Sequence, residues 1–165
     1  MSSRNKVRCY DYVNHPYAKV KDALSRESNQ IFQQSTKSAA ARVQDVVAEL
    51  RVNLAGIDLS KDVRISIKGI KEIPKKVGSP PKSNIELQWE ATENPGLFPV
   101  MHGELSIYPL TATETQLDFA GEYQVPLGAL GSVLDAAIGH RIAEASVLRF
   151  INDVATHLRS TLPGL

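Results

Sequence analysis

The sequence predicts an α+β fold in which a run of antiparallel strands is covered by one long C-terminal helix. Two observations support this prediction. Between residues 63 and 125, apolar and polar residues alternate with a period of two, which is typical of strands with one buried face. The segment 126–162 then shows the longest uninterrupted helical pattern in the chain. We therefore expect a strand, two shorter helices, a run of strands and a long helix, in that order.

The composition fits one globular domain over residues 1–165 and argues against several other classes of protein. Nineteen basic and eighteen acidic side chains leave a net charge of +1, which does not favour a nucleic-acid partner. The single cysteine, Cys9, cannot form an internal disulfide. The N-terminus lacks the apolar segment of a secretory signal, and no apolar run reaches membrane-spanning length. We expect a soluble cytoplasmic protein.

The first third of the chain predicts one strand followed by two helices. β-forming residues over 5–14 predict the strand. Pro16 fits the first turn of a helix, which we expect over residues 17–24. Residues 29–54 again show helical periodicity, with an expected interruption around residues 35–38.

The later strands are predicted from their alternation and from the turn signals between them. The basic, proline-rich segment 71–84 is interpreted as a solvated hairpin loop, since no aromatic residues interleave its lysines as a nucleic-acid site would require. Because the connections are short, consecutive strands are expected to pair antiparallel. The predicted strands cover residues 63–68, 85–91, 100–109 and 116–125.

The terminal helix is predicted over residues 132–161, where a start similar to a capping box is followed by a Pro-Gly stop. Its length would be about 45 Å, enough to cross a small domain. One apolar stripe is small in its first half and bulky in its second: Ala136, Gly139, Ala143, Val147, Phe150 and Val154.

A second apolar stripe lies nearly opposite the first and contains Leu130, Leu134, Ile138, Ile142 and Ala145. A surface helix needs only one such stripe. The second stripe is therefore expected to be covered by the earlier helices or loops, or by a second subunit. The third alternative is that the helix bends at Gly139, so that one stripe faces the core before the bend and the other faces it after the bend.

The junction from the last strand into the terminal helix reads Gly121-Glu122-Tyr123-Gln124-Val125-Pro126-Leu127-Gly128-Ala129-Leu130-Gly131. With the order of elements over nearly the whole chain, it resembles the helix-grip superfamily called SRPBCC. That superfamily includes START domains, the birch-pollen-allergen group and polyketide cyclase-like proteins. The resemblance implies a curved antiparallel sheet that grips the C-terminal helix. It also implies an apolar or amphipathic ligand between them, such as a lipid, sterol, hormone or polyketide.

The candidate ligand site lies between the apolar face of the strands and the small half of the helix. Small residues near Ala143 would leave space and Phe150 would bound one end, or these residues simply permit close packing. Tyr123 would offer one hydroxyl to an apolar cavity, or would be a core residue with its hydroxyl at the rim. The candidate ligand-binding residues are Ile67, Leu87, Trp89, Leu105, Ile107, Phe119, Tyr123, Arg141, Ala143, Val147 and Phe150.

No motif indicates a metal or cofactor, because no histidine pairs with another His or Cys at ligand spacing and no phosphate-binding loop follows a strand. His140 and Glu144 lie four residues apart on the helix, either as an acid–base pair at a pocket wall or as the solvent-facing ion pair that we favour. Arg141 would anchor a ligand carboxylate or extend to solvent. Cys9 is interpreted as a small core or edge residue.

Three functions are consistent with these patterns. The leading hypothesis is a non-catalytic protein that binds an apolar or amphipathic small molecule. The second is an enzyme of the cyclase or dehydratase type that uses Tyr123 and either His140 or Arg141. The third is an interaction module with a filled core, in which Leu130, Leu134, Ile138 and Ile142 form a homodimer surface.

Overall fold

A computed structural model describes residues 5–49, 63–91, 100–124 and 136–162 of the 165-residue chain. These residues form an α+β fold, as the sequence predicted, with five strands and two helices. The elements in chain order are β1 (Asn5–Val13), α1 (Tyr17–Glu49), β2 (Val63–Ile73), β3 (Lys82–Ala91), β4 (Val100–Thr111), β5 (Glu114–Gln124) and α2 (Ala136–Thr161).

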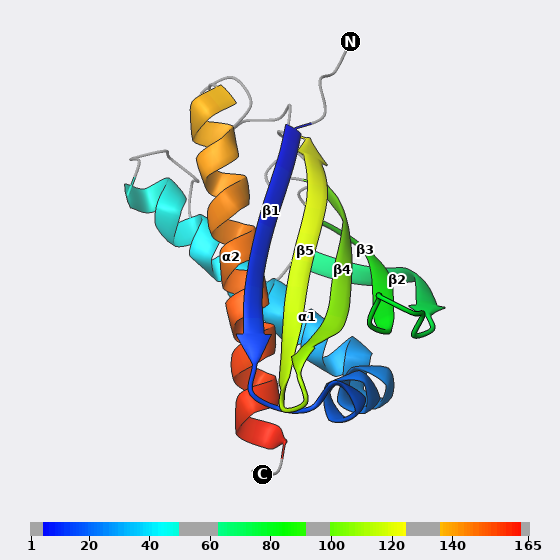
Figure 1. The fold of residues 1–165 in the computed structure, drawn as a ribbon. Coiled ribbons are helices and arrows are strands. Elements are labelled where there is room, and N and C mark those ends of the chain that lie inside the picture. Colours follow the sequence, from blue (N-terminus) through cyan, green and yellow to red (C-terminus); the bar gives the residue numbers. More distant parts are fainter. Residues whose placement is uncertain (1–4, 50–62, 92–99, 125–135, 163–165) are drawn as a thin grey trace.

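The five strands form one antiparallel sheet in the spatial order β1-β5-β4-β3-β2 (Figure 1). Strands β2 to β5 each pair with the next strand along the chain. Strand β1 pairs with β5, so the first and last strands of the chain are neighbours in the sheet. Alternation places one set of side chains on the face that the helices cover, which we call the inner face. The other set lies on the outer face.

The register arranges the inner face in rows that cross the sheet. Phe119 lies opposite Cys9 on one side and Leu105 on the other. The next row contains two glycines, Gly121 and Gly103, directly opposite each other. The third row brings Trp89, Met101 and Tyr123 side by side, each only 1% exposed.

Helix α2 lies alongside β1 and crosses α1 (Figure 1). Its buried positions recur at three- and four-residue spacing, as expected for a helix with an apolar stripe. The predicted first stripe is buried where it is described, through Ala143, Val147, Phe150 and Val154. At its last turn, Arg159 binds the Asp11 carboxylate at 2.8 Å and the backbone carbonyl of Tyr12, both on β1.

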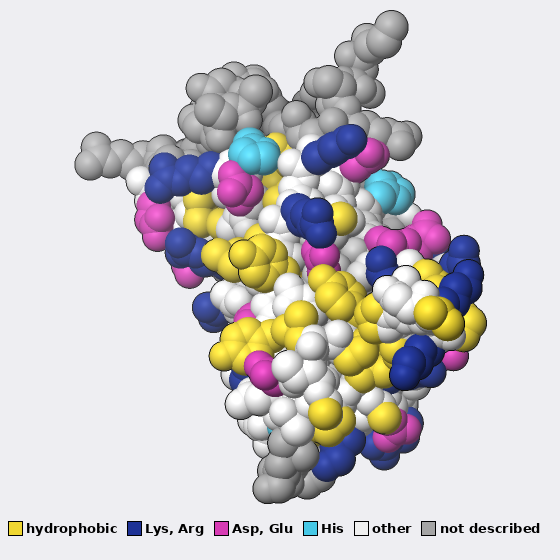
Figure 2. Space-filling model, viewed as in Figure 1, with side chains coloured by type: hydrophobic (Ala, Val, Ile, Leu, Met, Phe, Trp, Pro, Cys, Tyr) yellow, Lys and Arg dark blue, Asp and Glu magenta, His cyan; other side chains and the backbone are white. Residues whose placement is uncertain are grey.

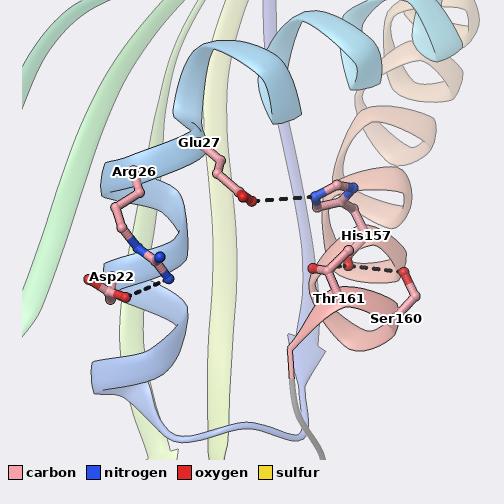
Figure 3. Close-up of polar contacts among 6 residues, drawn as sticks. All are labelled: Asp22, Arg26, Glu27, His157, Ser160 and Thr161. Carbon is pink, nitrogen blue, oxygen red and sulfur yellow. Dashed lines mark hydrogen bonds and ion pairs between the residues drawn. The ribbon is translucent and has the colours of Figure 1, made fainter.

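Helix α1 replaces the two separate helices that the sequence predicts. It contains one kink at Glu27, where φ is −121° and ψ is 17°, and this kink falls between the two predicted segments. The Glu27 carboxylate points toward His157 of α2, with 3.9 Å between oxygen and Nε2 (Figure 3). Arg26 pairs with Asp22 in the turn before the kink, at 2.8 Å. Residues 50–54 of the predicted second helix lie outside the described residues.

The interruption expected at residues 35–38 is wrong, because α1 is helical throughout that stretch. Its polar side chains face α2 instead of breaking the helix. Ser35 donates a hydrogen bond to the Asp153 carboxylate at 3.0 Å, and Ser38 donates to the same group at 3.4 Å. Thr36 donates to the carbonyl of Phe32 one turn earlier, so its hydroxyl is satisfied although it is fully buried.

The predicted loop at 71–84 is also too long. Strand β2 continues to Ile73 and β3 begins at Lys82, so the connection covers residues 74–81. The strands continue because Lys71 and Glu72 still pair with Asn84 and Ser83 in register. The connection between them is mostly exposed, as the solvated-loop interpretation expects.

The second apolar stripe of the terminal helix is described at few positions. Ile142 is 3% exposed within the single chain, so it is packed in the protomer and not presented to a partner. Leu130 and Leu134 lie outside the described residues, as does the side chain of Ile138. The homodimer surface therefore stays a prediction. Neither described helix has an apolar stretch long enough to span a bilayer.

Candidate functional site

The space between the sheet and α2 contains a cluster of four aromatic rings, one from each of four elements. Trp89 of β3 stacks on Phe119 of β5, with centroids 5.7 Å apart and planes at 12°. Phe150 of α2 lies 5.0 Å from Trp89 and 6.0 Å from Phe119, and Phe32 of α1 lies 6.0 Å from Phe150. All four side chains are buried, so these rings fill the centre of the grip.

The two facing glycines explain where the Phe119 ring lies. A Cβ atom on Gly103 would overlap that ring, and one on Gly121 would lie 2.9 Å from its Cε1. Without those Cβ atoms the inner face has a shallow trough between its first and third rows. The ring of Phe119 occupies this trough and reaches the stack with Trp89.

At its β5 end, the third row of the inner face continues into a polar chain, a series of contacts from Tyr123 through His140 to Glu144. The Tyr123 hydroxyl lies 2.8 Å from Nδ1 of His140, and Nε2 of His140 lies 2.8 Å from a carboxylate oxygen of Glu144. Tyr123 is buried, whereas the side chains of His140 and Glu144 are 47% and 57% exposed. The chain therefore links a buried phenol to a pair of groups at the surface of α2.

The direction of the Tyr123–His140 hydrogen bond depends on the tautomer of the imidazole. In the tautomer whose Nε2–H donates to Glu144, Nδ1 is an acceptor and the Tyr123 hydroxyl donates to it. Burial, and secondly the negative charge of Glu144, raise the pKa of Tyr123 above its ordinary value of 10.0. Tyr123 is therefore a neutral hydrogen-bond donor near neutral pH and is not a phenolate nucleophile.

Cys9 is half-buried on β1, the edge strand that pairs with β5, and the Glu144 carboxylate lies near its thiol. Burial and, secondly, the charge of Glu144 raise the pKa of its thiol above 9.0. A thiol with a raised pKa is a poor nucleophile, because the reactive species is the thiolate. This agrees with the interpretation of Cys9 as a small packing residue, which contacts the hydrophobic core.

Trp89 has a polar atom that its surroundings leave unsatisfied. Its indole Nε1–H is buried and has no hydrogen-bond acceptor among the described residues. A buried donor without an acceptor costs about 1–3 kcal/mol relative to a satisfied one. Most buried polar groups in proteins are hydrogen-bonded, so this N–H is a specific place at which to expect a missing acceptor.

The structure gathers most of the predicted site residues into one buried interior. Ile67 is half-buried against the core, and Arg141 is exposed on α2. The remaining predicted ligand-binding residues are each at most 1% exposed: Leu87, Trp89, Leu105, Ile107, Phe119, Tyr123, Ala143, Val147 and Phe150. Their contact with a ligand stays a prediction, as does the anchoring role of Arg141.

Sequence reasoning missed the contribution of α1 to this interior. Phe32 supplies one of the four rings, and Ile31, Ala39 and Val43 of the same helix are also buried. Phe32, Ala39 and Val43 are separated by seven and four residues, a spacing that indicates one buried helix face. Met101 was also missed, although alternation along the predicted strand 100–109 places it on the same face as Leu105 and Ile107. Its place between Trp89 and Tyr123 requires the pairing of β4 with both neighbouring strands.

A groove of about 630 Å³ lies on the outer face of the sheet, away from the predicted apolar pocket. Its volume is within the range of small-molecule sites, but it is open, and five of its ten lining residues are charged. Arg8 at its edge forms two hydrogen bonds with Asp118, at 2.7 and 3.1 Å. The groove is lined by Lys6, Val7, Arg8, Glu86, His102, Gly103, Glu104, Ala120, Gly121 and Glu122.

Metal binding has no structural support in the part of the chain that is described. Within residues 5–49, 63–91, 100–124 and 136–162, no three His, Cys, Asp or Glu side chains come together as potential ligands. Cys9, His140 and Glu144 are accounted for by the contacts given above.

Solved structures share this arrangement at low sequence identity. A conserved protein from Geobacillus kaustophilus is 12% identical over 95% of this chain and 97% of its own, with a TM-score of 0.53. A START superfamily protein from Mycobacterium smegmatis is 9% identical over 97% of this chain and 100% of its own, with a TM-score of 0.52. No protein-family model matches the sequence, and no curated protein gives a significant match. These structures share the fold of this chain, which is the helix-grip fold that the order of elements predicted.

Proposed function

We propose that this protein binds an apolar or amphipathic small molecule between the inner face of the sheet and α2. Lipids, sterols and polyketide-like molecules are the classes that such a site suits. The observation that supports the proposal best is the buried Trp89 N–H, which lacks an acceptor among the described residues. A ligand oxygen that accepts from Nε1 would satisfy it and recover the free energy that the orphaned donor costs.

The third row of the inner face has the composition of a small-molecule site. Trp89 and Met101 supply aromatic and flexible apolar surface, and Tyr123 supplies a hydroxyl. Trp89 and Tyr123 lie two strands apart, or about 10 Å at the usual spacing. An amphipathic ligand on this row would direct one oxygen toward Trp89 and place hydrocarbon over Met101.

The Phe119 ring is the side chain that a ligand would displace. It lies in the trough formed by two glycines and stacks on Trp89. Because it is held there by packing and not by a polar contact, a ligand that offers equivalent contacts can exchange with it. Binding is therefore expected to change the surroundings of Trp89.

Trp89 is the only tryptophan of the chain, so its fluorescence reports this row directly. We would titrate the protein with cis-parinaric acid, a fluorescent fatty acid that accepts energy from tryptophan. The expected result is saturable quenching of Trp89 with matching sensitised emission. Tyr123→Phe is expected to weaken binding by about fivefold if the hydroxyl assists the polar end of the ligand.

The matched control is Tyr10→Phe, because Tyr10 is 71% exposed on β1 and lies on the outer face. It is expected to leave the titration unchanged. Linear, non-saturating quenching in the wild-type protein would contradict binding in the grip. Native mass spectrometry of protein purified from its own source would complete the test, because a co-purified apolar molecule appears as a defined added mass.

A second candidate function, acid catalysis, is favoured by the polar chain alone. Tyr123 lies 2.8 Å from Nδ1 of His140, and Nε2 of His140 lies 2.8 Å from Glu144. When Tyr123 gives its proton to a substrate, the phenolate left behind would regain a proton from the imidazolium form of His140, through Nδ1, and the imidazole would then take a new proton from solvent. The same mass measurement separates the candidates. In Tyr123→Phe, a binding protein would retain the same bound mass at lower occupancy. An enzyme would accumulate a molecule of different mass, its unconverted substrate.

A further inference from the structure

We infer that the β2–β3 hairpin is a docking device for an anionic membrane surface. The hairpin connection, residues 74–81, ends in a tight turn that carries Val77 at its tip. The turn is closed by two backbone hydrogen bonds between Lys76 and Ser79, at 2.9 and 3.1 Å. Gly78 has φ of +81°, a conformation that glycine adopts without strain. Val77 is fully exposed, so an apolar side chain is held at the point furthest into solvent.

Positive charge surrounds this apolar tip. Residues 68–82 contain five lysines and one glutamate, a local charge of +4 in a chain whose net charge is only +1. The one glutamate, Glu72, is paired with Lys21 of α1 at 3.0 Å. None of the five lysines has a carboxylate partner in an ion pair among the described residues. They are Lys68, Lys71, Lys75, Lys76 and Lys82.

The surface view shows the same combination. Over the β2–β3 hairpin, at the right of the view, hydrophobic side chains are flanked by Lys and Arg side chains (Figure 2). Ile70 on β2 is 54% exposed and adds to the apolar part. The rest of the chain carries a net charge of −3, so the field of an anionic surface would orient the molecule with this hairpin toward it.

A lipid surface fits this hairpin better than a nucleic acid does. Anionic headgroups attract clustered lysines, and the boundary beneath them accepts a small apolar side chain. Nucleic-acid sites combine lysines with aromatic side chains on which bases stack, and residues 68–82 contain no aromatic residue. The prolines at 74, 80 and 81 stiffen the connection, so little conformational entropy is lost when the tip docks.

The test is co-sedimentation of the full chain with lipid vesicles. We expect binding to phosphatidylcholine vesicles that contain about 30% phosphatidylserine, and little binding to phosphatidylcholine alone. Binding should decline when the salt concentration rises from about 0.1 M to about 1 M, since the Debye length falls about threefold. Lys75→Ala/Lys76→Ala should weaken partitioning by about 25-fold, or about fivefold per lysine. Val77→Ser should weaken it by about tenfold.

The matched control is Lys19→Ala/Lys37→Ala, which removes the same charge from exposed positions on α1. It should change partitioning less than about twofold. An equal loss in this control, or equal binding to vesicles without phosphatidylserine, would overturn the inference. Tighter binding to a DNA oligonucleotide than to the anionic vesicles would also overturn it and assign the hairpin to nucleic acid. Because all substituted side chains are exposed, these variants are expected to fold normally, and cis-parinaric acid binding should be unchanged.

Discussion

The two faces of one sheet differ in what fills the space beside them. On the inner face, Phe119 lies in a trough between two glycines and packs against Trp89 of β3 and Phe150 of α2. On the outer face, Gly103 and Gly121 line an open groove of about 630 Å³ between charged side chains. The missing Cβ atoms of these glycines leave room only on the inner side, where the Phe119 ring occupies it. On the outer side the two glycines contribute only backbone to the lining of the groove.

The difference shows that the two faces offer different chemistry at the same rows of the sheet. The groove on the outer face has a volume in the range of small-molecule sites and includes both basic and acidic side chains, such as Lys6 and Glu104. The inner face is occupied at its centre by aromatic rings, and among the described residues it holds one buried indole N–H, that of Trp89, without an acceptor.

The largest expected effect comes from removing the Phe119 ring from the inner face of the sheet. Phe119→Ala removes a fully buried ring and should lower the free energy of unfolding by about 3–5 kcal/mol, measured by urea denaturation. Tyr10→Ala is the outer-face counterpart, since its side chain is 71% exposed, and it should change stability by no more than about 0.5 kcal/mol. Similar losses in the two variants would contradict the contrast between the faces.

An intermediate effect is expected from filling the trough. Gly103→Ala places a methyl group where the Phe119 ring lies and should destabilise the fold by about 1–3 kcal/mol. In the Phe119→Ala background the same substitution should cost much less, because the ring that opposes the methyl group is gone. A double-mutant cycle measures this coupling directly. Strict additivity would show that the trough is shaped by the backbone alone.

The smallest effect concerns the polar end of the inner face and depends on pH. The folded pKa of Tyr123 is raised above 10.0, so below that pH the hydroxyl is protonated in both states and its contribution is complete. Above it the unfolded chain loses the proton first, and the free energy of unfolding falls with pH until the folded pKa is passed. Tyr123→Phe should flatten this decline above about pH 10, compared by urea denaturation.

Cys9 gives an internal check on the same decline. Its raised pKa starts a similar loss of stability one unit lower, from 9.0 upward. Cys9→Ser should therefore flatten the part of the decline that begins at about pH 9, whereas Tyr123→Phe should act only above about pH 10. If neither variant changes the fall of the free energy of unfolding with pH, this fall does not come from Cys9 or Tyr123.

Much of the inner face could be predicted from local pattern. The alternation around Leu87 and Trp89, and around Leu105 and Ile107, assigned these residues to the buried face because side chains alternate strictly along a strand. The spacing of Ala143, Val147 and Phe150 identified the buried stripe of α2 for the same kind of reason. Periodicity within one element is sufficient for such predictions, and all of these residues are buried.

Contacts between distant elements could not be predicted in this way. Ser35 and Ser38 looked like a helix break, and their partner Asp153 lies 115 or more residues away. The trough depends on Gly103 being opposite Gly121, which requires the register of β4 against β5. The link from Tyr123 to His140 requires the rotation of α2 relative to the sheet, and a helical pattern leaves that rotation undetermined.

The pairing of β1 with β5 has a consequence for how the chain is made. Arg8 finds Asp118 only after 110 further residues have been synthesised, and Arg159, which fixes Asp11, comes later still. At a synthesis rate of about 5–20 residues per second, β1 waits roughly 5–20 s on the ribosome without its partner strand. A strand exposed for that time is open to wrong pairing. Its charged residues Lys6, Arg8 and Asp11 help it stay soluble until the last part of the chain emerges.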